Sequence, residues 1–246
     1  MKLFVDSANL KDIAEALKRG FVRGITTNPS LLAKEPKSAF EEHIEKIVAL
    51  ILYYQPGIHL SVEVFSREPN EILRQSVEFR RIFEYPDLSI KIQIGLDELE
   101  IINLLKKEGF SVNCTCLMTV NQAVMAAAAG ARYVSLFVGR IRDGGIDIGG
   151  KFEKELKDGF EKKTFTEKDF DPFTVIKETR MLLDKSYPDV EIIAGSMRSC
   201  NDIKMSGLAG AHIVTVPPKY FADMAAHFKT NEVVAQFLKD FEDWIK

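Results

Sequence analysis

A lysine in the middle of an apolar run is the residue of this sequence with the clearest chemical potential. Residues 88–94 read Leu-Ser-Ile-Lys-Ile-Gln-Ile, and their alternation is typical of a buried strand in which Lys91 faces away from the isoleucines. A lysine that is partly removed from water favours its neutral amine, which can attack a carbonyl carbon to form a Schiff base. The alternative is that Lys91 forms half of a structural ion pair.

Carboxyl, amide and hydroxyl groups are expected on the same inward side of neighbouring apolar runs. They are Asp6 in LFVD, Thr26 and Asn28 in GITTN, Glu63 in LSVEV, and Asn113 and Thr115 in SVNCTCL. Such groups are suited to moving protons and to binding hydroxyls around an amine. Two of them have simpler alternatives, because Asp6 could cap the next helix and Asn28 could belong to a turn before a proline.

Two arginines and a serine follow the sixth and seventh apolar runs. Arg140 comes after YVSLFV, and Ser196 and Arg198 come after EIIAG. Ser135 and Phe137 face the same side from within YVSLFV. On adjacent strand ends, guanidinium and hydroxyl groups would form a forked set of donors for a phosphate group. This pattern predicts a phosphorylated substrate, although these residues could also belong to the ordinary surface.

Eight short β-branched or aromatic runs recur along the 246 residues, most of them separated by stretches with helical periodicity. The runs are LFVD, GITT, LSVEV, LSIKIQI, SVNCTCL, YVSLFVG, EIIAGS and HIVTVP. The alternation predicts an α/β fold, a single (β/α)8 TIM barrel with its active site at the carboxyl ends of the strands. An open doubly wound sheet is the alternative, but no glycine-rich nucleotide-binding motif follows the first strand.

Three further segments complete the predicted domain of residues 1–246. Asn9 is expected to cap a helix that ends at Gly20. Residues 231–246 form a C-terminal helix with an apolar stripe that must pack on its own barrel or on a neighbouring subunit. Residues 150–171 form a charged insertion, which we interpret as a solvated segment or a lid.

The composition argues against several kinds of partner and against a metal site. The formal net charge is −3 with both signs spread along the chain, so we expect neither nucleic acid nor a membrane as partner. The N-terminus lacks the apolar length of a signal peptide, which predicts a cytoplasmic protein. Cys114 and Cys116 are expected to point outward as small packing residues, and with four scattered histidines we expect no metal site.

Seven motifs resemble the transaldolase family, in particular its short branch, which also contains the fructose-6-phosphate aldolases. They are DSAN, GITTNPS, SVEV, SIKI, the stretch from Val112 to Asp143, GSMR and AGAHIVTVPP, in that order over nearly the whole chain. The resemblance implies transfer of a dihydroxyacetone unit between sugar phosphates, as in the pentose phosphate pathway, with no metal or organic cofactor. It also implies a homo-oligomer, because the short branch generally forms pentamers or decamers.

The resemblance assigns a role to each candidate residue. Lys91 corresponds to the Schiff-base lysine and Asp6 to the residue that takes the C4 hydroxyl proton. Glu63 would move protons through a water that Thr115 helps to position. The substrate-binding residues would be Thr26, Asn28, Asn113 and Ser135, with Arg140, Ser196 and Arg198 on the phosphate and Phe137 as a pocket wall.

The choice between transferase and aldolase depends on two positions. Glu63 and Phe137 are similar to the transaldolase pattern, whereas the aldolases typically carry Gln and Tyr there. Gln93 and Gly95 depart from the Pro and Thr usual after the lysine, which could alter the pocket floor. We therefore predict a transaldolase, with fructose-6-phosphate aldolase as the near alternative and a non-catalytic sugar-phosphate-binding barrel as the more distant one.

Overall fold

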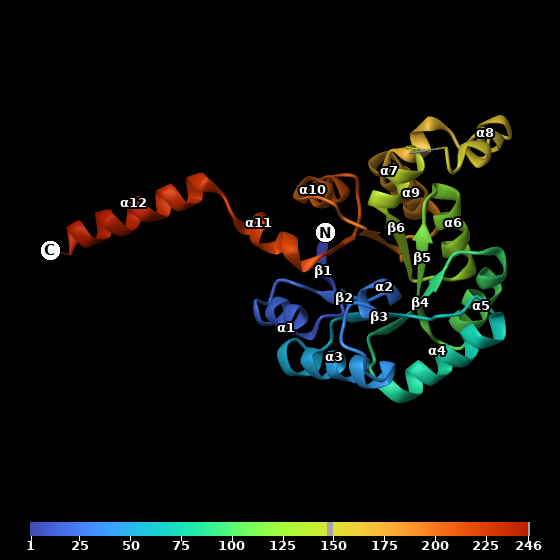
Figure 1. Cartoon of the computed structure of the whole chain (residues 1–246), viewed down its shortest axis with the longest axis horizontal. Helices are drawn as coiled ribbons and strands as arrows, with labels where there is room; N and C mark the ends of the chain where they lie inside the picture. Colours follow the sequence, from blue (N-terminus) through green and yellow to red (C-terminus); the bar gives the residue numbers. More distant parts are fainter. Residues whose placement is uncertain (147–149, 246) are drawn as a thin grey trace.

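Eight parallel strands form a closed barrel in chain order, which confirms the predicted (β/α)8 fold (Figure 1). The computed structural model describes residues 1–146 and 150–245. The strands are β1 (Lys2–Asp6), β2 (Gly24–Thr26), β3 (His59–Glu63), β4 (Leu88–Gln93), β5 (Ser111–Leu117), β6 (Tyr133–Phe137), β7 (Glu191–Gly195) and β8 (Ile213–Val216). Each strand lies within or overlaps one of the eight apolar runs of the sequence.

Helices follow each strand, and most of them cover the outside of the barrel. They are α1 (Leu10–Lys18), α2 (Pro29–Leu32), α3 (Phe40–Tyr54), α4 (Pro69–Phe83), α5 (Leu96–Lys107), α6 (Val120–Ala129), α7 (Val138–Gly144), α8 (Glu153–Glu161), α9 (Pro172–Ser186), α10 (Cys200–Leu208), α11 (Phe221–Ala225) and α12 (Phe228–Trp244), with 3-10 turns η1 (Glu167–Phe170) and η2 (Pro218–Tyr220). Asn9 caps α1 by accepting from the Asp12 N–H, and Gly20 follows it at a φ of +73°, as expected.

The core lies between the strands and the helices because strand residues alternate between two faces. Outward residues such as Val62, Ile90 and Ile92 are buried against the helices. A smaller apolar cluster of Phe4, Ile193 and Ile213 fills the inside of the barrel. The middle of the barrel interior is therefore apolar, and polar side chains lie toward the two ends of the barrel.

Strand β5 departs from regular alternation near its carboxyl end. Its pairing with β6 shifts register between Cys114 and Leu117, and Cys116 has a φ of +62°. Cys114 points outward and is fully buried, as predicted, but Cys116 lines the cavity at the carboxyl ends of the strands. The outward orientation predicted for Cys116 is wrong because a bulge reverses the face of the residues that follow it.

Helix α12 extends away from the barrel (Figure 1). None of its residues is buried, and Phe237 and Trp244 are 67% and 81% exposed. The helix thus has the predicted amphipathic sequence but no apolar partner within the described part of the chain.

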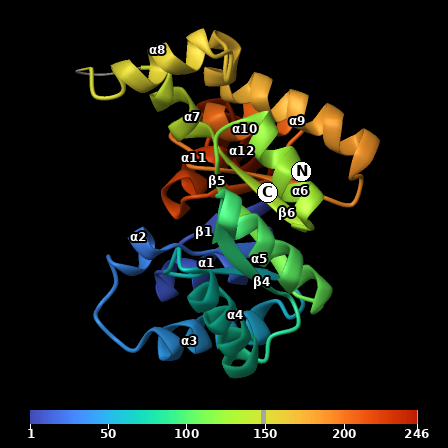
Figure 2. The same ribbon diagram turned by 90° about the vertical axis from the view of Figure 1, so that its right-hand side faces the viewer.

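The charged stretch 150–171 folds into α8 and η1, with three phenylalanines packed together at Phe160, Phe165 and Phe170. Two views place α8 at the periphery beyond α7 (Figure 1 and Figure 2). None of the residues that line the cavity described below comes from this segment. A role as a lid stays a prediction. Across the described residues, no helix combines the length and the hydropathy needed to cross a membrane.

Candidate active site

A cavity of about 510 Å³ opens at the carboxyl ends of the strands. Nine of the twelve candidate residues line it: Asp6, Thr26, Asn28, Glu63, Lys91, Ser135, Phe137, Arg140 and Ser196. They come from loops and strands separated by up to 190 positions, and the barrel brings them together because all parallel strands end at the same rim.

Lys91 lies at the bottom of this cavity with 4% of its surface exposed. Strands β3 and β4 pair Glu63 with Lys91, and the two side chains form an ion pair of 2.8 Å between Nζ and Oε2. The amine also donates to the Thr27 carbonyl at 3.1 Å. The sequence leaves open a reactive amine or a structural ion pair, and the structure pairs Lys91 with a carboxylate that lies within the same cavity and within proton-transfer distance.

Asp6 is held at the end of β1 by a neighbouring hydroxyl. Thr26 Oγ1 donates to Asp6 Oδ1 at 2.8 Å and lies 2.5 Å from Thr215 Oγ1. Burial raises the pKa of Asp6, while the charge of Lys91 and the hydrogen bond from Thr26 act in the opposite direction. Asn9, rather than Asp6, caps α1, so the capping alternative for Asp6 is wrong.

A chain of hydrogen bonds supports the floor of the cavity. Ser135 Oγ donates to Asn113 Oδ1 at 2.7 Å, and Asn113 Nδ2 donates to Ser61 Oγ at 2.9 Å. Asn113 is fully buried beneath Ser135 and does not itself line the cavity. Thr115 is also buried, and its hydroxyl has no hydrogen-bond partner among the described residues. Both residues lie below the cavity surface.

Asn28 both caps a helix and lines the cavity. Its side chain accepts from the Leu31 N–H at 3.0 Å and so caps the short helix α2. The same side chain lines the cavity. The turn interpretation and the site interpretation of Asn28 are therefore compatible.

The two arginines share one carboxylate at the rim. Arg198 donates from Nη1 to Asp143 Oδ1 at 2.6 Å, and Arg140 Nη1 lies 3.7 Å from Asp143 Oδ2. Arg198 is absent from the cavity lining, whereas Arg140 and Ser196 belong to it. Of the three donors that the sequence predicts for a phosphate, Arg140 and Ser196 line the cavity, and Arg198 pairs with Asp143 instead.

Gly139, in the first turn of α7, allows the segment after β6 to pack closely against the loop after β7. Its N–H donates to the Ser196 carbonyl at 3.1 Å. A Cβ at position 139 would lie 2.7 Å from both that carbonyl oxygen and Arg198 Nε. Any larger residue would therefore push the β7 loop, and with it Ser196 and Arg198, away from α7.

Four polar lining residues were not predicted from the sequence: Ser30, Lys34, Cys116 and Thr215. Ser30 lies within α2. Thr215 has inward parity on β8, so the alternation that found Ser135 could have found it. Lys34 lies just beyond α2, where no strand pattern marks an inward face. Cys116 depends on the β5 bulge, which has no distinct signal in SVNCTCL.

The unusual residues after Lys91 do not line the cavity. Gln93 Nε2 donates to the Ser66 carbonyl at 2.8 Å and lies 3.3 Å from Glu98 Oε1. A Cβ on Gly95 would lie 1.9 Å from Glu98 Oε2, so this glycine makes room for the Glu98 carboxylate. Gln93 and Gly95 therefore shape the surroundings of the Glu98 carboxylate, next to the loop that follows β3.

Comparisons with known proteins give one consistent result. The family model described as Transaldolase/Fructose-6-phosphate aldolase matches residues 3–245. A probable transaldolase of Alkaliphilus metalliredigens is 33% identical over the whole length of both chains. A probable transaldolase of Caldicellulosiruptor saccharolyticus is 35% identical, covering 98% of this chain and 97% of its own. A third, from Thermoanaerobacter sp., is 34% identical over all of this chain and 98% of its own.

Proposed function

The chain belongs to the transaldolase/fructose-6-phosphate aldolase family, and we propose that it is a transaldolase that moves a dihydroxyacetone unit from a ketose phosphate to an aldose phosphate. The donor would be fructose 6-phosphate or sedoheptulose 7-phosphate. Because phosphorylated sugars are charged and do not cross membranes unaided, we place the reaction in the cytoplasm. The observation that carries the proposal is the buried Lys91 amine in one cavity with Glu63 and Asp6, with Arg140 at the rim.

The proposed reaction begins with proton transfer from the Lys91 ammonium group to Glu63, 2.8 Å away. The neutral amine then attacks C2 of the ketose, and loss of water from the carbinolamine gives a protonated imine. Asp6 removes the C4 hydroxyl proton, the C3–C4 bond breaks, and its electrons pass to the imine to form an enamine. An aldose phosphate leaves with the C4 carbonyl.

The second half of the reaction reverses these steps with a different aldehyde. The enamine carbon attacks the acceptor carbonyl, and Asp6 returns its proton to the new hydroxyl. Water then adds to the imine, and the amine leaves as the product ketose forms. In this proposal Thr26 orients Asp6, and Thr115 helps to position a water for Glu63.

Substrate binding is proposed to divide between the floor and the rim. Ser135, supported by Asn113, and Asn28 would hold the hydroxyls of the three-carbon fragment. Arg140 and Ser196 would bind the phosphate, and Arg198 would join them by exchanging the Asp143 carboxylate for it. Phe137 would form the adjacent wall.

Transfer is tested directly by supplying fructose 6-phosphate with and without erythrose 4-phosphate. A transaldolase forms sedoheptulose 7-phosphate and glyceraldehyde 3-phosphate only when the acceptor is present. Steady release of free dihydroxyacetone without acceptor would instead identify a fructose-6-phosphate aldolase. No conversion in either mixture, with substrate still bound, would identify the non-catalytic sugar-phosphate-binding barrel.

Substitution of Thr26 by valine is expected to move the acid limb of the pH profile of kcat/KM to higher pH. The Thr26 hydrogen bond stabilises the charged form of Asp6, so its removal raises the pKa of Asp6 further. Activity that needs ionised Asp6 is lost as pH falls through that pKa, and the loss begins earlier in the variant. The exposed Thr164→Val is the control, and an acid limb that stays in place or moves to lower pH would contradict the role of Thr26.

We also propose that the chain forms a homo-oligomer, a pentamer or decamer, in which α12 packs on a neighbouring subunit. The helix presents an apolar side with no partner in the described part of its own chain, and such a surface requires cover in water.

Removal of residues 228–246 is expected to reduce the oligomer to smaller species and to leave the barrel folded. The barrel core contains no residue of α12, so its packing does not depend on the helix. Light scattering coupled to size exclusion measures the mass of both proteins, with Lys229→Gln as a full-length control. Equal assembly sizes for the truncated and full-length chains would contradict this role of α12.

A further inference from the structure

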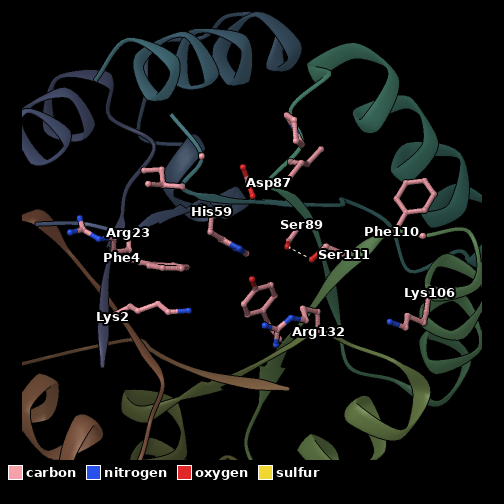
Figure 3. A pocket seen from close by; sticks show the side chains of 16 residues that line it. Lys2, Phe4, Arg23, His59, Asp87, Ser89, Lys106, Phe110, Ser111 and Arg132 are labelled. Carbon is pink, nitrogen blue, oxygen red and sulfur yellow. Dashed lines mark hydrogen bonds between the residues drawn. The ribbon is translucent and has the colours of Figure 1, made fainter. Parts of the chain in front are cut away.

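A second cavity, of about 700 Å³, lies at the amino ends of the strands, opposite the Lys91 site. Its lining includes residues at or near the starts of five strands. They are Lys2, His59, Ser89 and Ser111, which Figure 3 labels, and Tyr133. In TIM barrels this end normally serves stability rather than catalysis. A concave volume of this size is nevertheless within the range of small-molecule sites.

Positive charge dominates the described lining of this cavity. The cationic side chains are Lys2, Arg23, Lys106 and Arg132, and the acidic one is Asp87. Figure 3 shows Lys2, Arg23 and Arg132 around His59, with Lys106 farther out beyond Ser111. Glu191, at the edge, pairs with Lys2 at 2.7 Å and with Arg132 at 3.4 Å. The four cationic side chains exceed the two carboxylates, Asp87 and Glu191, by two positive charges. This excess matches the charge of a dianion.

Arg132 has donor capacity that the protein does not use. Its Nη2 reaches Glu191, but Nη1 is buried and has no hydrogen-bond partner among the described residues. The guanidinium group lies over the Tyr133 ring, 5.2 Å from its centroid, which fixes its plane. Nη1 is enclosed by the protein, but 42% of the Arg132 side chain is exposed, so the rest of the guanidinium group can donate to a ligand oxygen in the cavity.

The floor of the cavity is uncharged and preorganised. His59 stacks on Phe4 with ring centroids 5.0 Å apart, and its Nε2 lies 2.5 Å from Ser61 Oγ. Burial, together with the charges of Lys2 and Arg132, lowers the pKa of His59 to about 3, so the ring is neutral at physiological pH. The paired hydroxyls of Ser89 and Ser111, 2.6 Å apart, add neutral polar groups.

We propose that this cavity is a second binding site, for a small phosphorylated organic molecule, with its phosphate between Arg132, Lys2 and Arg23. Guanidinium groups suit phosphate oxygens because they donate in a planar fork. An inorganic phosphate ion would leave most of the 700 Å³ empty. The organic part has room beside Ser89, Ser111 and the Tyr133 ring, which offer hydroxyl and aromatic contacts. The site is independent of the function proposed for the carboxyl end of the barrel.

The test measures binding of glucose 6-phosphate by calorimetry in a full-length R140Q/R198Q background, which weakens phosphate binding at the other end. We expect about one molecule bound per chain, binding that weakens as sodium chloride is raised, no detectable binding of glucose, and weaker binding of inorganic phosphate. Adding Arg23→Gln and Arg132→Gln to the background is expected to weaken binding at least about tenfold.

Two controls keep the result interpretable. Arg74→Gln in the same background removes one positive charge from the exposed face of α4 and is expected to leave the affinity unchanged. Lys2→Gln with Lys106→Gln leaves both arginines in place and tests the site even if the arginine variant fails to fold. The proposal is overturned if the background protein binds no glucose 6-phosphate, if neither set of cavity substitutions weakens binding, or if Arg74→Gln weakens it equally. Binding of inorganic phosphate as tight as that of the ester would overturn the organic-phosphate assignment.

Discussion

Replacement of Lys91 by methionine is expected to reduce transfer on the order of 10⁴-fold or more. The change removes the only group in the proposed reaction that can form the imine, and without the imine the C3–C4 bond has no acceptor for its electrons. Methionine has a similar length and no charge, so it fits a site that is 4% exposed. The measurement is the rate of sedoheptulose 7-phosphate formation from fructose 6-phosphate and erythrose 4-phosphate.

The control for this variant is Lys18→Met, in the last turn of α1, which changes the same charge far from the cavity. Its rate is expected to match that of the unmodified protein. A Lys91→Met protein that is folded and keeps more than about a tenth of the activity would rule out covalent catalysis by this residue.

Replacement of Asp6 by asparagine is expected to reduce kcat about 10²- to 10⁴-fold, the usual contribution of one acid–base group. The variant keeps the shape of the side chain but cannot accept the C4 hydroxyl proton. Because its amine remains, the Asp6→Asn protein is expected to form the imine with fructose 6-phosphate and to stall before bond cleavage. The measurement compares kcat with the yield of borohydride-trapped protein.

The same substitution is expected to raise the thermal midpoint near neutral pH. Burial raises the pKa of Asp6 in the folded state above its value in the unfolded chain. As the pH rises, the unfolded chain therefore loses this proton first. The free energy of unfolding falls between the unfolded and the folded pKa of Asp6. Above that interval ionised Asp6 costs stability, and asparagine removes the cost. The gain should disappear at acid pH, and Asp189→Asn on the surface should show neither effect. A lower midpoint at neutral pH would contradict the burial argument.

The barrel could be predicted from the sequence because its signals are local and repeated. Each strand is an apolar run with period two, and the connecting helices carry their own caps, as Asn9 does for α1. The α12 helix shows the limit of this reasoning. Its apolar stripe predicts a helix that must be covered, but not which surface covers it, because that depends on groups far away in the sequence or in another subunit.

Much of the candidate site followed from strand parity combined with the position of the strand ends. That reasoning put Lys91 and Glu63 on the same face and offered an ion pair of Lys91 as an alternative, but it did not identify Glu63 as the partner, because parity gives a face and not a contact. It failed at Cys116, where a bulge changes the face. It also did not indicate that Asp143 would hold Arg198, since that contact joins α7 to the β7 loop and depends on their packing.

Reduction with borohydride in the presence of fructose 6-phosphate, followed by mass mapping of the peptides, tests the central claim most directly. Reduction would turn the imine into a stable amine, and we predict a dihydroxyacetone or hexose phosphate adduct on the peptide that contains Lys91 and on no other, with none in Lys91→Met. Full transfer activity without an adduct at Lys91, or with the adduct on a different lysine, would contradict the account.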